Sequence, residues 1–207
     1  VVPVPVYQLA NVVSDTYTGV PAAWAAAGGL TGRGVKIGIV DTGIDYYHAD
    51  FAGSGDPEDF SGDDGVTIGT AAFPSAKVAG GFDFVGDDYD AGGFGDAVIP
   101  HPDPDPLDCD GHGTHTAATA AGFGVLSDGT TFHGPYNTGT LSGQQFKVGP
   151  GSAPEATLYA LRVFGCSGST DMVVDAIDWA VKNHLDVLSL SLGTPFGDPG
   201  SADSVAA

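Results

Sequence analysis

A histidine at position 112 lies in a setting that suits a general base. It stands between two glycines in the segment 110–117, Asp-Gly-His-Gly-Thr-His-Thr-Ala, and small residues follow it as far as Gly122. This pattern predicts the N-terminal end of a closely packed helix, because the glycines leave room for another backbone to approach. Imidazole has the side-chain pKa nearest neutrality, which makes histidine the usual general base. The helix macrodipole at this end disfavours the protonated ring and so favours a neutral base.

A carboxylate that could orient this histidine follows a predicted strand earlier in the chain. The segment 35–45, Val-Lys-Ile-Gly-Ile-Val-Asp-Thr-Gly-Ile-Asp, begins with an apolar, β-branched run that is typical of a buried parallel strand and that ends at Asp41. Functional groups in open parallel sheets gather just beyond the carboxyl ends of the strands. An aspartate there that accepts from an imidazole N–H is the orienting member of a Ser-His-Asp triad.

Together the two segments resemble the subtilisin-like serine proteases, the subtilases. The likeness is carried by Val-Asp-Thr-Gly-Ile-Asp at 40–45 and by the histidine segment at 110–117, and a third family segment, Ser-Leu-Ser-Leu-Gly, follows at 189–193. Aspartate, histidine and then serine is the order of the triad in this family. The resemblance implies an α/β fold with a three-layer, mostly parallel sheet and helices on both faces, incomplete at the C-terminus.

The resemblance also implies a role for each matching residue. Asp41 would fix the tautomer of His112 and stabilise its imidazolium, and His112 would serve as general base and then as general acid. Ser191, Leu192 and Gly193 would line the primary specificity pocket and pair with an extended substrate through backbone hydrogen bonds. A plain sheet-core interpretation of this last segment stays open, because leucines alternate there with small serines.

The two cysteines of the chain, Cys109 and Cys166, are expected to form a disulfide, because subtilases with cysteines at both matching positions join them. An extracellular location would permit this bond, and two free thiols are the alternative. His115 has no chemistry assigned by the resemblance and is expected to be packed and hydrogen-bonded. A zinc site on His112 and His115 is disfavoured, because a zinc protease helix carries His-Glu-x-x-His.

Calcium is the cofactor that the resemblance leaves open. Asp50 matches a position that ligates calcium in many subtilases, but the second loop of that site falls in a long insertion at 127–154. The acidic segments 87–90 and 103–110 also offer the oxygen ligands that calcium prefers, although solvated acidic loops are the commoner outcome. We therefore expect no obligatory cofactor and no metal ligand set, with calcium as a possibility.

The family's nucleophile, a serine in Gly-Thr-Ser, is missing from the sequence. Gly-Thr occurs five times and is never followed by serine. The serine and the oxyanion-hole asparagine are therefore expected beyond Ala207. We interpret the chain as the N-terminal portion of a secreted serine endopeptidase that works by acyl transfer, inactive as a 207-residue fragment. The alternative is a non-catalytic acidic binding domain or a pseudo-protease, because fold alone does not imply activity.

The elements that must position these residues alternate between strands and helices. Residues 1–19 are expected to be a propeptide end and linker, kept extended at the start by prolines, and residues 20–207 the peptidase portion. A helix is predicted at 20–27 and another from His112. A further helix, capped by Ser169 or Thr170, carries an apolar stripe at Val173, Val174, Ile177, Val181 and Leu185. Strands are predicted at 35–41, 77–85, 156–164 and 186–192.

The charge of the chain limits its partners. Six Lys and Arg against 26 Asp and Glu give a net charge of −20, which repels nucleic acid and anionic membranes. The sequence contains no stretch of 18 or more apolar residues, so no membrane span is predicted. We therefore expect protein or peptide substrates and the chain's own propeptide as partners, no nucleic acid or membrane, and a secreted, extracellular location.

Overall fold

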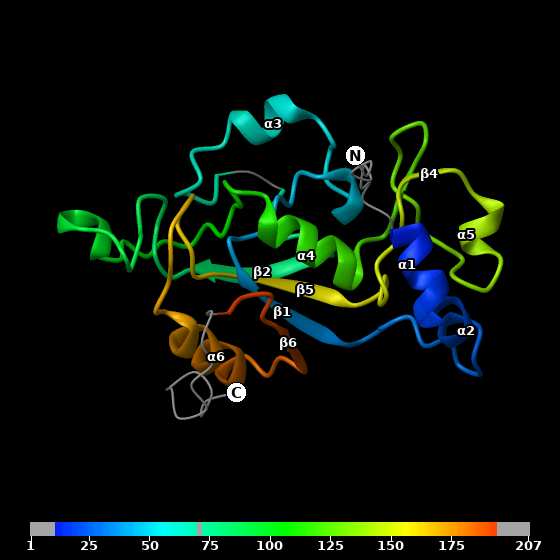
Figure 1. Cartoon of the computed structure of the whole chain (residues 1–207). Helices are drawn as coiled ribbons and strands as arrows, with labels where there is room; N and C mark the ends of the chain where they lie inside the picture. Colours follow the sequence, from blue (N-terminus) through cyan, green and yellow to red (C-terminus); the bar gives the residue numbers. More distant parts are fainter. Residues whose placement is uncertain (1–10, 70–71, 194–207) are drawn as a thin grey trace, which may run out of the picture.

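A parallel sheet between two layers of helix forms the centre of the computed structural model, which describes residues 11–69 and 72–193 (Figure 1). Four strands hydrogen-bond in the order β2-β5-β1-β6, and all the pairings are parallel. Their bounds are β1 (Lys36–Asp41), β2 (Val78–Asp83), β5 (Thr157–Arg162) and β6 (Val187–Ser189). The strands that end at Asp41 and Arg162 lie side by side in the middle.

Helices cover both faces of this sheet, which confirms the expected layered α/β fold (Figure 1). Helix α4 (His112–Ala121) packs its small residues on one face, and helix α6 (Val173–Lys182) packs on the other. Alternate side chains of β1 serve the two layers, since Ile37 and Ile39 join the core under α4 while Val40 joins the core under α6. The two central strands, β1 and β5, are mostly buried, and they read as nearly continuous apolar runs in the sequence.

Shorter elements surround this framework. They are α1 (Asn11–Thr18), α2 (Val20–Trp24), the 3₁₀ turn η1 (Ala49–Phe51), α3 (Pro57–Ser61), the 3₁₀ turn η2 (Gly95–Val98), β3 (Val125–Leu126), α5 (Thr140–Gly143) and β4 (Phe146–Val148). Strands β3 and β4 form a separate antiparallel pair. Residues 11–18 were expected to be linker but form helix α1, which packs against α2. The helix ends before Gly19, which adopts a left-handed φ of 80°. The prolines near the start lie outside the described residues.

Helix α6 differs from its prediction at both ends. Its first residue is Val173, and the hydroxyl of Ser169 bonds the carboxylate of Asp90 at 2.8 Å instead of capping the helix. Thr170 accepts the N–H of the residue just before the helix and is not the cap either. Val181, predicted on the apolar stripe, is 68% exposed. The buried face keeps Val173 and Ile177 of the predicted stripe and adds Ala176 and Ala180.

The last described strand is shorter than expected. Strand β6 covers Val187–Ser189, whereas the alternating pattern predicted 186–192, and it pairs with β1 alone among the described strands. Residues 190–193, which follow it, belong to no strand. Within the described part of the chain, no helix is long and apolar enough to cross a membrane.

Candidate active site

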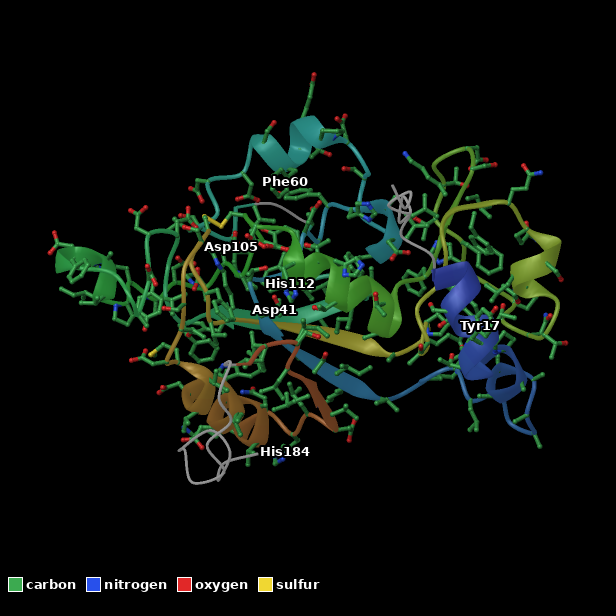
Figure 2. All side chains as sticks on the ribbon, viewed as in Figure 1. Tyr17, Asp41, Phe60, Asp105, His112 and His184 are labelled. Atoms are coloured by element: carbon green, nitrogen blue, oxygen red, sulfur yellow. A yellow bond between two sulfur atoms is a disulfide. The ribbon has the colours of Figure 1, made fainter. Side chains whose placement is uncertain are left out.

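The end of β1 and the start of α4 bring the predicted aspartate and histidine together, as Figure 2 shows. The Nδ1 atom of His112 lies 2.7 Å from the Oδ1 atom of Asp41. The carboxylate is 2% exposed, while the imidazole is 51% exposed. A carboxylate only accepts, so Nδ1 carries the proton in this bond and Nε2 keeps its lone pair. The free nitrogen of a neutral His112 is therefore the one that could take a proton from a reacting group.

Two further donors hold the buried carboxylate in place. The N–H of Thr42 donates to Oδ1 of Asp41 at 2.8 Å. The hydroxyl of Thr116 lies 3.2 Å from Oδ2 of Asp41 and shares its proton with the carbonyl of Gly113 at 3.0 Å. A buried carboxylate without such donors would be costly, so these bonds help to hold Asp41 in place beside the ring. Thr116 was not predicted from the sequence, although its place four residues after His112 puts it on the same helical face.

A close backbone approach seats α4 against the end of β1. A Cβ atom at Gly113 would lie 2.2 Å from the carbonyl oxygen of Gly43, nearer than any side chain tolerates. Gly43 itself has a φ of 113°, a left-handed conformation that suits glycine. This confirms that the glycine after His112 makes room for another backbone. The same close approach brings the start of α4, and with it the ring of His112, within reach of Asp41.

The acidic surroundings of His112 raise its pKa above the usual value. The hydrogen bond to Asp41 is the largest cause, burial acts in the opposite direction, and the charges of Asp41, Asp110 and Asp108 add to the rise. The sequence argument from the helix macrodipole was therefore wrong about the net effect, because nearby full charges outweigh partial backbone charges. The ring becomes a stronger base but needs a higher pH to be neutral.

A cleft of about 280 Å³ opens beside the pair. One wall comes from Ser191, Leu192 and Gly193, the residues expected to contact substrate. The other wall was not predicted and consists of Phe164, Gly165, Ser167 and Gly168. These residues follow the carboxyl end of β5, so the rule that led to Asp41 could have identified them. A larger hollow of about 510 Å³, lined partly by Tyr46, Tyr47 and Asp63, contains neither Asp41 nor His112.

Comparison with known proteins identifies the family of the chain. The sequence profile described as "Subtilase family" matches residues 32–207. The chain belongs to the subtilase family. It is 33% identical over 195 residues to the minor extracellular protease Vpr of Bacillus subtilis (strain 168), covering 93% of this chain and 18% of that protein.

Relatives from other organisms match as broadly. The subtilisin-like protease SBT2.2 of Arabidopsis thaliana is 35% identical, over 94% of this chain and 24% of its own length. Thermitase of Thermoactinomyces vulgaris is 31% identical, over 89% of this chain and 46% of its own length. The chain of this subtilase thus spans less than half of each of these three relatives.

A disulfide braces the same end of the subtilase sheet. Cys109 is bonded to Cys166, with 5.2 Å between their Cα atoms, so the loop before His112 is joined to the wall of the cleft. The guanidinium of Arg162, which is itself buried, donates toward Cys109 Sγ at 3.0 Å and bonds Asp87 at 2.7 Å. This buried cation was not predicted from the sequence. Its place as the one charged residue in the apolar run 156–164 was the available signal.

In the described ranges of this subtilase, one group of three His, Cys, Asp or Glu side chains brings its ligand atoms together. It consists of Asp87, Cys109 and Cys166, and both sulfurs are engaged in the disulfide. Asp50 is fully buried, and its Oδ1 accepts the N–H of Gly124 at 2.6 Å. Calcium binding stays a prediction from the resemblance. His115 was expected to be packed, but it is exposed on α4.

Proposed function

We propose that this chain supplies the acid–base pair and one side of the substrate cleft of a serine endopeptidase. The observation that carries the proposal is the 2.7 Å contact between His112 Nδ1 and Asp41 Oδ1 beside an open cleft. That contact leaves Nε2 unprotonated in the neutral ring, which is the state a general base requires. Membership of the subtilase family supports the same conclusion.

In the proposed reaction, His112 moves protons while Asp41 keeps the ring oriented. Nε2 takes the proton of a serine hydroxyl as the serine oxygen bonds to the peptide carbonyl carbon. Nε2–H then gives that proton to the departing amine as the carbon–nitrogen bond breaks. Water repeats the two transfers and releases the acyl group, which returns the serine to its starting form. Asp41 stabilises the imidazolium at each stage without accepting its proton.

The serine of this reaction is proposed to lie outside the 207 residues of the chain. The sequence contains no Gly-Thr-Ser, and the chain covers only part of each relative compared above. The segment at 191–193 is proposed to bind the substrate backbone as an added strand, since it continues β6 along the cleft beyond the last paired residue. The substrates are therefore extended polypeptides.

We also propose that the protein works outside the cell and is made as a precursor. The disulfide suits an oxidising compartment, and one relative is named an extracellular protease. The precursor proposal extends to residues 1–19, which would include the end of an inhibitory segment. Detection of the mature protein in the culture medium, with its N-terminus determined by mass spectrometry, would test both points.

Labelling with a fluorophosphonate tests the catalytic proposal. The 207-residue chain should not label, because it lacks the serine, whereas the full-length protein that carries it should label and cleave denatured protein. In the full-length protein, His112→Ala should abolish labelling. His115→Ala is a matched control, because His115 lies on the same helix but is exposed and does not contact Asp41.

Other results would contradict the proposal in distinct ways. Strong labelling of the 207-residue chain would mean that the nucleophile has been misplaced. A folded full-length protein that never labels would favour the binding domain or pseudo-protease. Equal loss of labelling in the His112 and His115 variants would point to damaged folding rather than lost chemistry.

A further inference from the structure

A second carboxylate, Asp108, joins the two segments that carry the catalytic pair. It precedes His112 by four residues, is 2% exposed and lies between the loop after β1 and the first turn of α4. We propose that Asp108 is a positioning residue that fixes the separation and direction of Asp41 and His112. The inference rests on the proposed function for its catalytic meaning and on the hydrogen bonds of Asp108 for its geometry.

One oxygen of Asp108 gathers three donors. Its Oδ1 accepts the hydroxyl of Thr42 at 2.8 Å, and Thr42 is the residue directly after Asp41. The same oxygen accepts the N–H groups of Asp110 at 3.0 Å and of Gly111 at 2.9 Å. Since Gly111 directly precedes His112, this one atom links the side chain of the residue after Asp41 to the backbone of the residue before His112.

The other oxygen binds the first turn of α4. Oδ2 of Asp108 accepts both the N–H of Thr114 at 2.8 Å and its hydroxyl at 2.6 Å. The hydroxyl of Thr114 in turn accepts the N–H of Asp45, in the loop after β1, at 2.8 Å. The hydroxyl of Thr42 accepts the N–H of Gly113, on α4, at 2.8 Å. Each threonine therefore accepts from the opposite segment and sends its own proton to Asp108.

This arrangement requires an ionised acceptor at position 108. All five of its hydrogen-bond partners are donors, so an amide there would turn its own N–H bonds toward at least one of them. Without Asp108, the hydroxyl protons of Thr42 and Thr114 have no fixed acceptor. The two hydrogen bonds that these hydroxyls accept from the opposite segment then weaken together. A misplacement of about 1 Å between catalytic groups costs about 10²-fold in rate.

The charge of Asp108 also reaches the histidine. The negative groups that raise the pKa of His112 are Asp41, Asp110 and Asp108. Asp45 lies near Asp108 in the loop after β1; burial is the main cause of its raised pKa, and the charge of Asp108 adds a smaller part. Loss of Asp108 should therefore lower the pKa of His112 as well as loosen its position, a combination that a purely structural residue would not produce.

The test compares Asp108→Asn with Asp83→Asn in the full-length protein. Asp83 is an equally buried carboxylate that accepts the backbone N–H groups of Val85 and Gly86 at the end of β2, two strands from β1 in the sheet, so it controls for general damage. We expect the fluorophosphonate labelling rate of Asp108→Asn to fall about 10- to 100-fold, and that of the control by less than about threefold. The acid-side midpoint of the rate should move to lower pH only in Asp108→Asn.

Thr114 supplies a second, milder pair of variants in case Asp108→Asn does not fold. Thr114→Val removes the hydroxyl and should slow labelling, whereas Thr114→Ser keeps the hydroxyl and should restore the rate. Equal rates and equal pH midpoints in wild type and folded Asp108→Asn would overturn the proposal, as would equal rates in the two Thr114 variants.

Failure of the proposed function would look different, because the wild-type protein itself would not label. The positioning role would then be decided by NMR of the His112 ring. A low-field Nδ1–H signal that is present in wild type and Asp83→Asn but lost in Asp108→Asn would support it. An unchanged signal and an unchanged His112 pKa in Asp108→Asn would refute it.

Discussion

Replacing Gly113 by alanine should separate the proposed catalytic pair, Asp41 and His112, without removing either member. The added Cβ would lie 2.2 Å from the carbonyl oxygen of Gly43, about 1.2 Å short of an ordinary contact of 3.4 Å. If α4 retreats by that distance, the 2.7 Å bond between His112 and Asp41 lengthens beyond hydrogen-bonding range. The structural cost of such overpacking is about 1–3 kcal/mol. The rate should fall by about 10²-fold, the usual penalty for a 1 Å misplacement.

The assay measures stability and chemistry on the same protein. Urea unfolding of full-length Gly113→Ala gives the free energy of unfolding, and the fluorophosphonate labelling rate reports the catalytic pair. Gly143→Ala is the matched control, because a Cβ at Gly143 meets nothing within 4 Å and that residue has no left-handed φ. If Gly113→Ala labels as fast as Gly143→Ala, then α4 absorbs the methyl group without moving His112, and the argument from the close approach is refuted.

Three other predictions concern the disulfide, pH and a buried carboxylate. Reduction of the disulfide between Cys109 and Cys166, which are 57 positions apart, should lower the free energy of unfolding by about 4 kcal/mol in the loop-entropy estimate. Superimposable urea curves with and without a dithiol would contradict this prediction. Labelling should slow as the pH falls through the raised pKa of His112, since the protonated ring cannot accept a proton. Asp41→Asn removes the largest cause of that raised pKa and should shift the acid limb of the pH–rate profile to lower pH. An unmoved acid limb would count against this cause. Burial raises the pKa of Asp50 from 3.8 to about 7, so its contribution to stability is full below pH 3.8 and is lost as the pH rises through 7. Asp50→Asn should therefore be more stable than wild type at about pH 8 but not at pH 3.8. Equal urea midpoints of the two proteins at both pH values would disprove this prediction.

The sequence alone determined the order of strand and helix around Asp41 and His112. The β-branched run before Asp41 and the small residues after His112 are local patterns, and their consequences are local too: a strand buried on both faces and a helix that packs closely. The α/β layers follow because alternating elements of this kind have few ways to bury their apolar surfaces. The glycine at 113 was informative for the same reason, since its lack of a side chain has meaning only if a backbone comes near.

Only the tertiary structure decided how the pair is held and how strongly the histidine binds its proton. The pKa of His112 depends on charges at Asp41, Asp110 and Asp108, and the helix-end argument from the sequence missed their combined effect. The cleft wall that begins at Phe164 faces His112 although the two lie far apart in the chain. Periodicity and capping rules describe neighbours within a few residues, whereas desolvation, charge and hydrogen bonding depend on which distant segments meet. The five donors on Asp108 come from two segments of the chain, which is why no local pattern announces that residue.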